Sequence, residues 1–249
     1  MSLVNNHAVV TGGATGIGLA ITRALVNAGA TVTIMGRDKK RLDSIANESN
    51  KIKAVQVDIT DVESVNTAFA KASLTAPISI LINNAGKAFA SPFHKTSFDM
   101  WQKIIAVNLT GTYLTISAVL AEINKAKHGR IINIASISGL EGAAYTSAYS
   151  ASKHGVIGLS KSLACELSKV NTTINSICPA FVNTDIVESA IINIMKLTGR
   201  NRESALQSIL DTTGQSRLIE PEEVAQEVIK LCAPKADNIN STSIVMDGK

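Results

Sequence analysis

Aromatic residues are scarce in this sequence and its charge is nearly balanced, and both properties argue against nucleic-acid binding. Phe, Trp and Tyr together make up 4% of the 249 residues, so few side chains are available to stack on bases. The formal net charge of +4 is modest for a chain of this length and lacks the strong basic excess of nucleic-acid-binding domains. We therefore expect no nucleic-acid partner.

The sequence also lacks clustered metal ligands. Its four histidines lie far apart, and its three cysteines show no metal-like spacing. An odd number of cysteines cannot all pair within one chain, and buried, reduced thiols are typical of cytosolic proteins. We predict neither a structural nor a catalytic metal. The cysteines are Cys165, Cys178 and Cys232.

Long apolar runs are missing as well. No apolar run approaches the roughly 18 residues needed to span a bilayer. The first strand-like segment begins at His7, which leaves no room ahead of it for a signal peptide. We expect a cytoplasmic protein with no membrane association.

What the sequence does contain is a regular alternation of strand-like and helix-like segments. Short β-branched runs separated by helices predict parallel strands joined by right-handed crossovers and buried on both faces. This pattern predicts an α/β fold with a doubly wound parallel sheet, the Rossmann fold. No linker-like segment divides the chain, so we expect one domain over residues 1–249. Strands are predicted at 8–10, 31–35, 54–57, 78–82, 130–134, 173–177 and 243–246, and helices at 17–27, 38–48, 98–124 and 149–169, with one more between the third and fourth strands.

The segment from about 184 to 215 breaks this alternation. It contains two glycines, Gly199 and Gly214, and an apolar patch at 191–195. It follows the carboxyl end of a predicted strand, where open α/β sheets bind ligands. We favour a helical flap over a substrate site, and an insertion without a role in the site is the alternative.

A glycine-rich turn follows the first strand directly. Gly12, Gly16 and Gly18 allow a tight turn, close approach of a phosphate to the backbone, and close packing of helix on strand. The next helix directs its free N–H groups and positive dipole end at a bound pyrophosphate. A turn of this kind between a strand and a helix indicates dinucleotide binding.

At these residues the chain resembles the short-chain dehydrogenase/reductase family. Thr11–Gly18 matches the family's Thr-Gly-x-x-x-Gly-x-Gly motif, Asn83–Gly86 matches its Asn-Asn-Ala-Gly motif, and Asp58 matches the acid that contacts the adenine amino group. The resemblance runs from Val9 to Gly248. The cofactor contacts that it implies are Gly12, Thr15, Gly16, Ile17, Gly18, Arg37, Asp58, Ile59, Asn84, Ala85, Gly86, Tyr149, Lys153, Pro179, Val182 and Thr184.

The end of the second strand indicates which dinucleotide is bound. A carboxylate there accepts hydrogen bonds from the ribose diol, whereas an arginine binds a 2′-phosphate. By alignment to the family, Gly36 replaces the NAD-selecting acid and Arg37 takes the phosphate-binding position. We favour NADP(H) over NAD(H). Asp38 lies 20 positions after Gly18, a spacing that suits a ribose-binding acid, although it also suits the N-cap of the next helix.

Tyr149 and Lys153 lie four residues apart, on one face of a predicted helix. A cation close to a phenol favours the phenolate, so we expect the pKa of Tyr149 to fall toward neutral pH. The pair alone is common by chance. Ser136 precedes Tyr149 by 13 residues, the separation between serine and tyrosine in the family, and Asn108 matches the asparagine that completes the family's tetrad through a bound water.

The resemblance implies a mechanism for these four residues. The nicotinamide delivers hydride to a carbonyl carbon while Tyr149 protonates the oxygen and Ser136 hydrogen-bonds it. Lys153 also holds the nicotinamide ribose, and Asn108 with a water connects the proton path to solvent. Ser138, two residues beyond the strand end, is expected to belong to the pocket or loop.

Two positions depart from the family pattern. Ala180 follows Pro179 where the family has glycine, which narrows the backbone freedom there. Lys249 stands where the family commonly has glycine, and we expect that change to affect subunit packing more than chemistry. Val182 and Thr184 remain candidates for carboxamide or phosphate contacts.

The segments around Tyr149 and Pro179 look most like those of 3-oxoacyl and polyketide ketoreductases, which act on thioesters of a carrier protein or coenzyme A. A thioester-linked or small carbonyl substrate is therefore expected, and an acyl carrier protein is a candidate partner. Lys127 and Lys169 are candidate contacts for that acidic partner, or ordinary solvated lysines. The pocket is expected to be apolar and lined by Leu140, Ala143, Ala144, Tyr145, Phe181 and Ile186.

Two other functions stay open. One is an NAD-dependent dehydrogenase of a 3-hydroxy acid or another secondary alcohol. The other is a non-catalytic dinucleotide sensor, which the complete tetrad argues against because a sensor needs no Tyr–Lys pair beside a serine. The resemblance also implies a homotetramer or homodimer.

Overall fold

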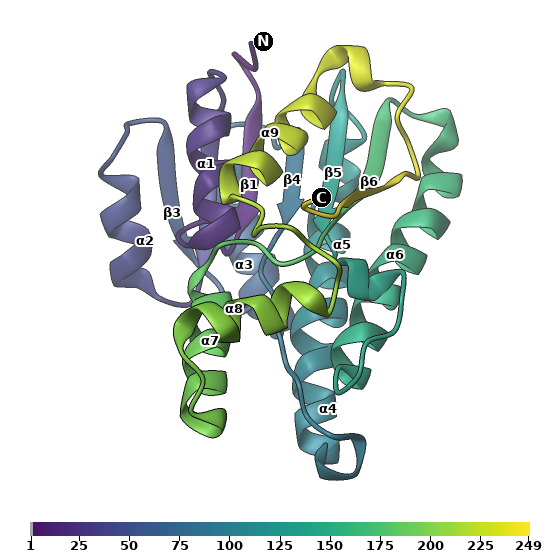
Figure 1. The fold of residues 1–249 in the computed structure, drawn as a ribbon. Coiled ribbons are helices and arrows are strands. Elements are labelled where there is room, and N and C mark those ends of the chain that lie inside the picture. The colour runs from purple at the N-terminus through teal and green to yellow at the C-terminus, as the bar shows by residue number, and fades with distance from the viewer. Residues whose placement is uncertain (1) are drawn as a thin grey trace.

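A computed structural model describes residues 2–249. In these residues a single sheet of seven parallel strands has the order β3-β2-β1-β4-β5-β6-β7, with helices on both faces (Figure 1). The predicted α/β fold, a doubly wound Rossmann-type sheet in one domain, is confirmed. The strands are β1 His7–Thr11, β2 Thr31–Gly36, β3 Ile52–Gln56, β4 Ile80–Asn83, β5 Gly129–Ile134, β6 Thr172–Pro179 and β7 Ser243–Met246.

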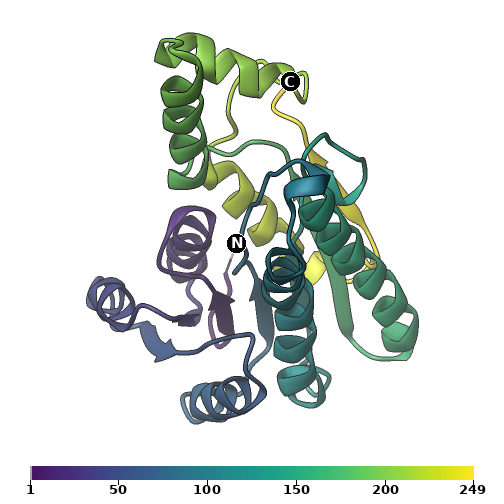
Figure 2. The ribbon, with the colours of Figure 1, turned by 90° about the horizontal axis from the view of Figure 1, so that it is seen from below.

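The helices cover the sheet in two layers, which the view from below separates clearly (Figure 2). Adjacent residues of β1 point to opposite faces, so that Val10 joins the apolar core under α1 and α9 while Val9 joins the core under α3, α5 and α6. Burial on both faces explains why the strands are continuous apolar runs. The helices are α1 Gly16–Asn27, α2 Lys39–Ala46, α3 Val62–Ser73, α4 Phe98–Ile105, α5 Gly111–Ile123, α6 Ser147–Glu166, α7 Asp185–Thr198, α8 Arg202–Asp211 and α9 Pro221–Cys232.

The strand order reverses next to β1, which lies between β2 and β4. In open α/β sheets a ligand binds in the crevice outside the carboxyl ends of the strands at such a reversal. All strands are parallel, so their carboxyl ends meet at one edge of the sheet, the lower edge in Figure 1. The glycine-rich turn after β1 therefore lies in this crevice.

The predicted helix 98–124 is a continuous helical segment with a π-helical turn at Ala106–Thr110 between α4 and α5. The segment Phe98–Ile123 is long and apolar enough, by composition, to cross a membrane, with a mean hydropathy of 1.7 in its most apolar window. The expectation that no segment reaches that apolarity is corrected here. Ile116, Val119 and Ile123 are buried in the core beneath the sheet, so we interpret the segment as a core helix.

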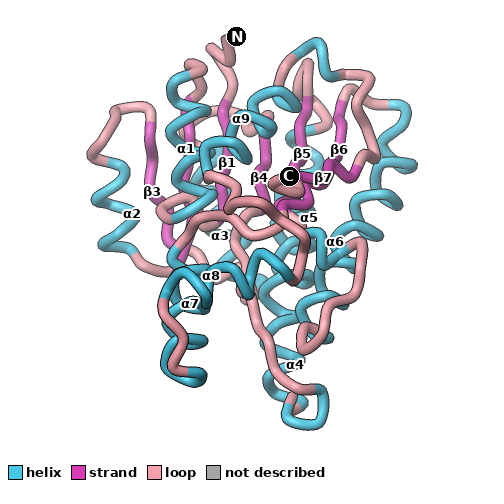
Figure 3. The backbone as a smooth tube through the Cα atoms, in the orientation of Figure 1, coloured by secondary structure: helices cyan, strands magenta, loops and turns pink. Residues whose placement is uncertain are grey.

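The predicted flap folds as two helices, α7 and α8, which project below the carboxyl ends of the strands (Figure 3). Val187 and Ile191 of α7 pack against Ala205 and Ile209 of α8 in an apolar cluster separate from the two sheet cores. Its base is fastened by a parallel bridge between Val182 and Ile219. The helical part of the prediction is confirmed, and its role over a substrate stays a prediction.

His7, at the start of β1, is a buried titratable group at the edge opposite the crevice. Its ring bonds the Ala76 carbonyl (2.7 Å) and the Thr33 hydroxyl (2.8 Å). Burial lowers the His7 pKa below its usual 6.5, although the Ala76 carbonyl and Glu122 act in the opposite direction. The folded chain therefore binds this proton less readily than the unfolded chain.

This shift predicts a loss of stability in mild acid. The unfolded chain takes up the proton as the pH falls below about 6.5, so the free energy of unfolding should decline from there through the folded-state pKa. Denaturant unfolding between pH 5 and 8 measures it. The variant His7→Gln should show a flatter pH dependence in this range, and parallel curves for the two proteins would contradict the prediction.

Candidate active site

The glycine turn after β1 is built for close contact with a ligand. Gly12 and Gly16 have left-handed backbone angles, with φ of 64° and 47°, which favour glycine. At Gly18, a Cβ would lie 2.5 Å from Asn84 Nδ2 and nearer still to the carbonyl of Gly12. A side chain at 18 would therefore separate the turn from α1, and the bare backbone forms a cradle that fits the predicted dinucleotide.

The end of β4 is locked to this turn by hydrogen bonds. The Thr11 hydroxyl accepts from the backbone N–H groups of Asn84 and Ala85, each at 3.0 Å. The Asn84 amide donates to the carbonyls of Thr11 (3.0 Å) and Gly12 (3.2 Å). Thr11 is the first residue of the Thr-Gly-x-x-x-Gly-x-Gly motif, but it was not predicted as a site residue. Its hydroxyl at the end of β1 was the feature that could have indicated its role in holding Asn84 and Ala85.

The amino end of α1 faces the same crevice. Thr15 is the N-cap residue of α1, and its backbone is extended. Its side chain makes no capping hydrogen bond, and the first turn of the helix contains no acidic residue among the described residues. Ile17, in the first turn of α1, is half-buried and packs against the apolar core under α1 and α9. A helix N-terminus without a competing carboxylate suits an anionic group, so these residues also fit a pyrophosphate.

The specificity end of the crevice contains Arg37 and Asp58, which line one cavity with Gln56, Val57 and Ser64. Asp58 accepts from the Thr60 hydroxyl (2.7 Å) and N–H (2.9 Å). These bonds, with smaller contributions from the charges of Arg37 and Lys87, hold the Asp58 pKa below its usual value against the opposing effect of burial.

Asp38 caps α2, because its Oδ1 accepts from the Arg41 N–H at 3.1 Å. Of the two interpretations that the sequence left open, the N-cap is therefore the one that the geometry shows. Lys39 pairs with Asp43 at 2.8 Å, while Arg37 makes no ion pair within residues 2–249. Ile59 is buried and lies against Gly111, where an added Cβ would approach its side chain to 2.8 Å.

Tyr149, Ser136 and Lys153 converge at the carboxyl ends of β5 and β6. Ser136 follows β5 and caps a short 3-10 helix, Ile137–Gly139, and its hydroxyl lies close enough to that of Tyr149 to lower the Tyr149 pKa. Lys153, one turn along α6, places Nζ 5.8 Å from the centre of the Tyr149 ring. Its ammonium donates to the Ile134 carbonyl at 2.7 Å.

The electrostatics of this group differ from the sequence expectation. Burial raises the Tyr149 pKa above 10, and the hydrogen bond from Ser136 only partly opposes this effect. Burial lowers the Lys153 pKa to about 8, with the Cys178 thiol acting in the opposite direction. The expected acidic phenol is therefore corrected: in this structure Tyr149 is a neutral phenol near pH 7, whereas Lys153 titrates close to neutrality.

Asn108 lies in the π-helical turn and is buried. Its Oδ1 accepts from the Lys87 N–H (2.8 Å), and its Nδ2 donates to the Lys87 carbonyl (3.0 Å) and to Ser152 Oγ (3.0 Å). Gly86 lies close by, since a Cβ there would be 3.3 Å from Asn108 Oδ1 and 3.7 Å from Lys153 Nζ. π-helical turns inside α-helices occur often at functional sites. The sequence analysis predicted neither this turn nor the hydrogen bond between Asn108 and Ser152.

The segment after β6 completes the crevice. Pro179 is the last residue of β6, and Val182 is buried at the base of the flap. Thr184 is the N-cap residue of α7, and its methyl group would lie 3.3 Å from a Cβ added at Gly16. Ala180 is absent from the described non-glycine residues with positive φ. Alanine therefore fits this position without left-handed strain.

The predicted pocket residues come from the loop before α6 and the start of the flap. Leu140, Tyr145 and Ile186 are exposed at the carboxyl edge of the sheet. Tyr145 has a left-handed φ of 67°, and its carbonyl accepts from the Ser91 N–H at 2.7 Å. The Ser138 N–H donates to Ser136 Oγ (3.1 Å), so Ser138 helps to orient the predicted catalytic hydroxyl.

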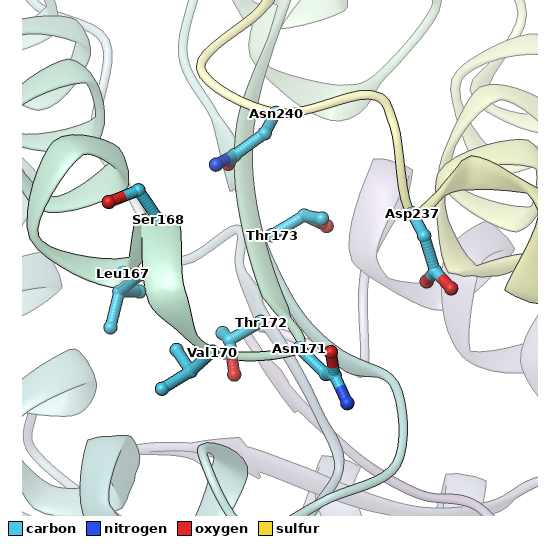
Figure 4. A pocket seen from close by; sticks show the side chains of 8 residues that line it. All are labelled: Leu167, Ser168, Val170, Asn171, Thr172, Thr173, Asp237 and Asn240. Atoms are coloured by element: carbon cyan, nitrogen blue, oxygen red, sulfur yellow. The ribbon is translucent and has the colours of Figure 1, made fainter.

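Lys127 and Lys169 do not lie near this group. Lys127 precedes the first residue of β5, and Lys169 precedes β6, so both lie at the amino-terminal edge of the sheet. A polar pocket at that edge is lined by Leu167, Ser168, Val170, Asn171, Thr172, Thr173, Asp237 and Asn240 (Figure 4). The sheet therefore lies between these lysines and Tyr149, and their contact with an acidic carrier protein stays a prediction.

Comparisons with known proteins agree with this geometry. The model of the short chain dehydrogenase family matches residues 6–193. The 3-oxoacyl-[acyl-carrier-protein] reductase FabG of Aquifex aeolicus (strain VF5) is 36% identical over 254 residues, covering 100% of this chain and 98% of that protein. The D-beta-hydroxybutyrate dehydrogenase of Rhizobium meliloti (strain 1021) is 34% identical over 259 residues, covering 97% and 96%.

A solved structure of an actinorhodin polyketide ketoreductase variant with NADPH has a TM-score of 0.92 and 29% identity, covering 98% of this chain and 96% of that one. The fold and the crevice, taken with these similarities, define an oxidoreductase with a Rossmann-type sheet. The chain belongs to the short chain dehydrogenase family.

Proposed function

We propose that this protein is an NADPH-dependent ketoreductase that reduces a 3-oxoacyl thioester or a similar ketone. The observation that carries the proposal is the placement of the Tyr149 hydroxyl beside that of Ser136, with Lys153 Nζ 5.8 Å from the centre of the Tyr149 ring, at the edge of the dinucleotide cradle. The similarity to FabG, named as a 3-oxoacyl-[acyl-carrier-protein] reductase, supports the substrate class.

The residues of the site would act as follows. A bound nicotinamide dinucleotide supplies the hydride. Ser136 donates a hydrogen bond to the substrate carbonyl oxygen, and Tyr149, a neutral phenol at pH 7, donates the proton that this oxygen takes up. Lys153 is charged below its pKa of about 8 and stabilises the negative charge left on Tyr149. Asn108 holds the loop that carries Gly86 against this group.

A substrate panel tests the reaction class. Purified protein is mixed with NADPH or NADH and with ketones, 3-oxoacyl thioesters of coenzyme A or a carrier protein, or the corresponding alcohols with oxidised dinucleotide, and the nicotinamide absorbance is followed. We expect the highest kcat/KM with NADPH and a 3-oxoacyl thioester. Tight dinucleotide binding without turnover on any member of the panel would instead support a sensor.

The second candidate is an NAD-dependent dehydrogenase of a 3-hydroxy acid. The similarity to a D-beta-hydroxybutyrate dehydrogenase over 97% of this chain favours it. In the panel it would appear as oxidation of a free 3-hydroxy acid that exceeds reduction of every thioester, with NAD preferred over NADP.

Cofactor choice should depend on Arg37. Its guanidinium forms no ion pair with any carboxylate of residues 2–249. It lines the same cavity as Asp58. Because a hydrogen bond to a charged group contributes about 1.5–3 kcal/mol, Arg37→Ala should lower kcat/KM with NADPH by about 10- to 100-fold. The value with NADH should change little.

The matched control is Lys71→Ala, which removes a cation from the last turn of α3. It should leave the NADPH-to-NADH ratio of kcat/KM unchanged. The assignment of NADP fails if the wild-type protein prefers NADH and Arg37→Ala leaves that ratio as it was.

A further inference from the structure

Ser152 lies between Tyr149 and Lys153 in the sequence, but its side chain is completely buried, with 0% exposure. Its hydroxyl donates to the Tyr149 carbonyl at 2.6 Å and accepts from Asn108 Nδ2 at 3.0 Å. One side chain therefore bonds both the backbone of α6 at Tyr149 and the π-helical turn.

The Asn108 amide continues this connection to a third element. Its oxygen accepts from the Lys87 N–H, and its nitrogen donates to the Lys87 carbonyl as well as to Ser152. Lys87 directly follows Gly86 in the loop after β4, whose preceding residues are held to the glycine turn by Thr11. The result is a connection from the dinucleotide cradle to the first turn of α6 through these hydrogen bonds and the short backbone segment from Asn84 to Lys87.

We propose that Ser152 is a positioning residue that, through Asn108, fixes the first turn of α6 relative to the cofactor crevice. It would set the distance between the Tyr149 hydroxyl and the bound dinucleotide without touching substrate or cofactor. The proposal rests on the proposed function, because it assigns Ser152 a role in that same site.

Loss of the Ser152 hydroxyl has two physical consequences. An N–H of the Asn108 amide is left without its partner in a buried environment, which lowers the stability of the fold and hence its Tm. The start of α6 also loses its connection to Asn108, so Tyr149 and Lys153 can shift. A misplacement of about 1 Å in an active site can cost about 100-fold in rate.

The same helix offers a matched control in Ser160, which is also buried. The Ser160 hydroxyl donates to the Val156 carbonyl (2.8 Å) and accepts from Asn133 Nδ2 (2.8 Å), as Ser152 does with Tyr149 and Asn108. Ser160 also accepts from Ser176 at 3.0 Å. It lies two turns farther along α6 and bonds the sheet instead of the π-helical turn.

The experiment compares Ser152→Ala with Ser160→Ala, using the carbonyl substrate that the wild-type protein reduces. Below both melting temperatures, Ser152→Ala should lower kcat by at least about 10-fold, whereas KM and the dinucleotide Kd stay within about 3-fold of wild type. Its pH–rate profile should also shift, because the surroundings of the Tyr149 hydroxyl change. Ser160→Ala should lower Tm comparably and change kcat by less than about 2-fold.

Several results would overturn the proposal. An unchanged kcat in Ser152→Ala, or an equal loss of kcat in both variants, shows that Ser152 acts only through stability. If Ser152→Ala does not fold, Ser152→Cys replaces the hydroxyl with a thiol, whose hydrogen bonds are weak. The proposal then expects a partial loss of kcat, and a kcat and pH profile equal to those of wild type would count against it.

Failure of the proposed function would look different. In that case the wild-type protein would reduce no carbonyl, or Tyr149→Phe would be as active as wild type. Wild-type turnover that Tyr149→Phe abolishes and Ser152→Ala leaves intact would reject the positioning role alone.

Discussion

Replacing Tyr149 with phenylalanine should lower kcat by about 1,000-fold, within the 10²- to 10⁴-fold range that general acid–base catalysis contributes. The change removes one oxygen atom and leaves the half-buried ring in place. Dinucleotide binding should therefore stay within about 3-fold of wild type, because the hydroxyl removed is one of many predicted cofactor contacts, whereas the reaction depends on it directly. Steady-state rates and a fluorescence titration with NADPH measure the two quantities.

The structure gives the reason for this large effect. Tyr149 supplies the hydroxyl that Ser136 contacts, and its raised pKa keeps it protonated at neutral pH. The other two tyrosines, Tyr113 on α5 and Tyr145 in the loop before α6, are both exposed. Tyr113→Phe, a change of the same kind on α5, is the control and should retain wild-type kcat. A folded Tyr149→Phe variant with near-normal turnover would refute the proposed mechanism.

Substituting alanine for Gly18 should reduce dinucleotide affinity by more than about 100-fold, because a backbone shift in the cradle removes several N–H contacts to the pyrophosphate at once. The new Cβ would lie 2.5 Å from Asn84 Nδ2 and even nearer to the Gly12 carbonyl. The Gly12 carbonyl belongs to the backbone, and the Asn84 amide is held by its hydrogen bonds to Thr11 and Gly12, so the turn and α1 must separate. Calorimetric titration with NADPH, together with Tm, measures the effect.

Gly158→Ala is the matched control for this substitution. Gly158 lies within α6, and an added Cβ there meets nothing within 4 Å. Because alanine favours a helix interior by about 0.5–1 kcal/mol relative to glycine, Tm should rise slightly and affinity should not change. Unaltered NADPH affinity in Gly18→Ala would mean that the glycine turn does not bind the dinucleotide.

Much of the fold could be predicted because parallel strands buried on both faces leave a plain signal in the sequence. The β-branched run 31–35 and the glycines at 12–18 identified β2 and the turn at the strand reversal. The boundaries were less certain: β3 begins at Ile52, two residues before the prediction, because its register pairs Ile52 with Val32. Pairing between strands is a tertiary property that local composition does not specify.

For the site, the sequence predicted which residues lie together but not their electrostatics. The spacing of Ser136, Tyr149 and Lys153 correctly anticipated that these side chains meet. Their pKa values were not anticipated, because the direction for Tyr149 depends on burial, which a motif does not record. Lys127 and Lys169 lie before β5 and β6, at the amino-terminal edge of the sheet, and their contact with a carrier protein stays a prediction.

The π-helical turn and the role of Ser152 are the features that sequence reasoning missed. An extra residue in a helix has no compositional signature, and Asn108 reads as an ordinary helical position within an apolar segment. Ser152 likewise reads as a neutral residue between Tyr149 and Lys153. Only the packing of α6 against the turn shows that these two polar side chains bond each other.

The apolar cluster within α7 and α8 has an evolutionary consequence. Because Val187, Ile191, Ala205 and Ile209 pack mainly among themselves and not in the sheet cores, mutations on the outer surface of this helical pair need not weaken the framework that holds the tetrad. If the pair selects the substrate, as we propose for a flap, selection can diversify what the protein reduces while the reaction itself is inherited unchanged.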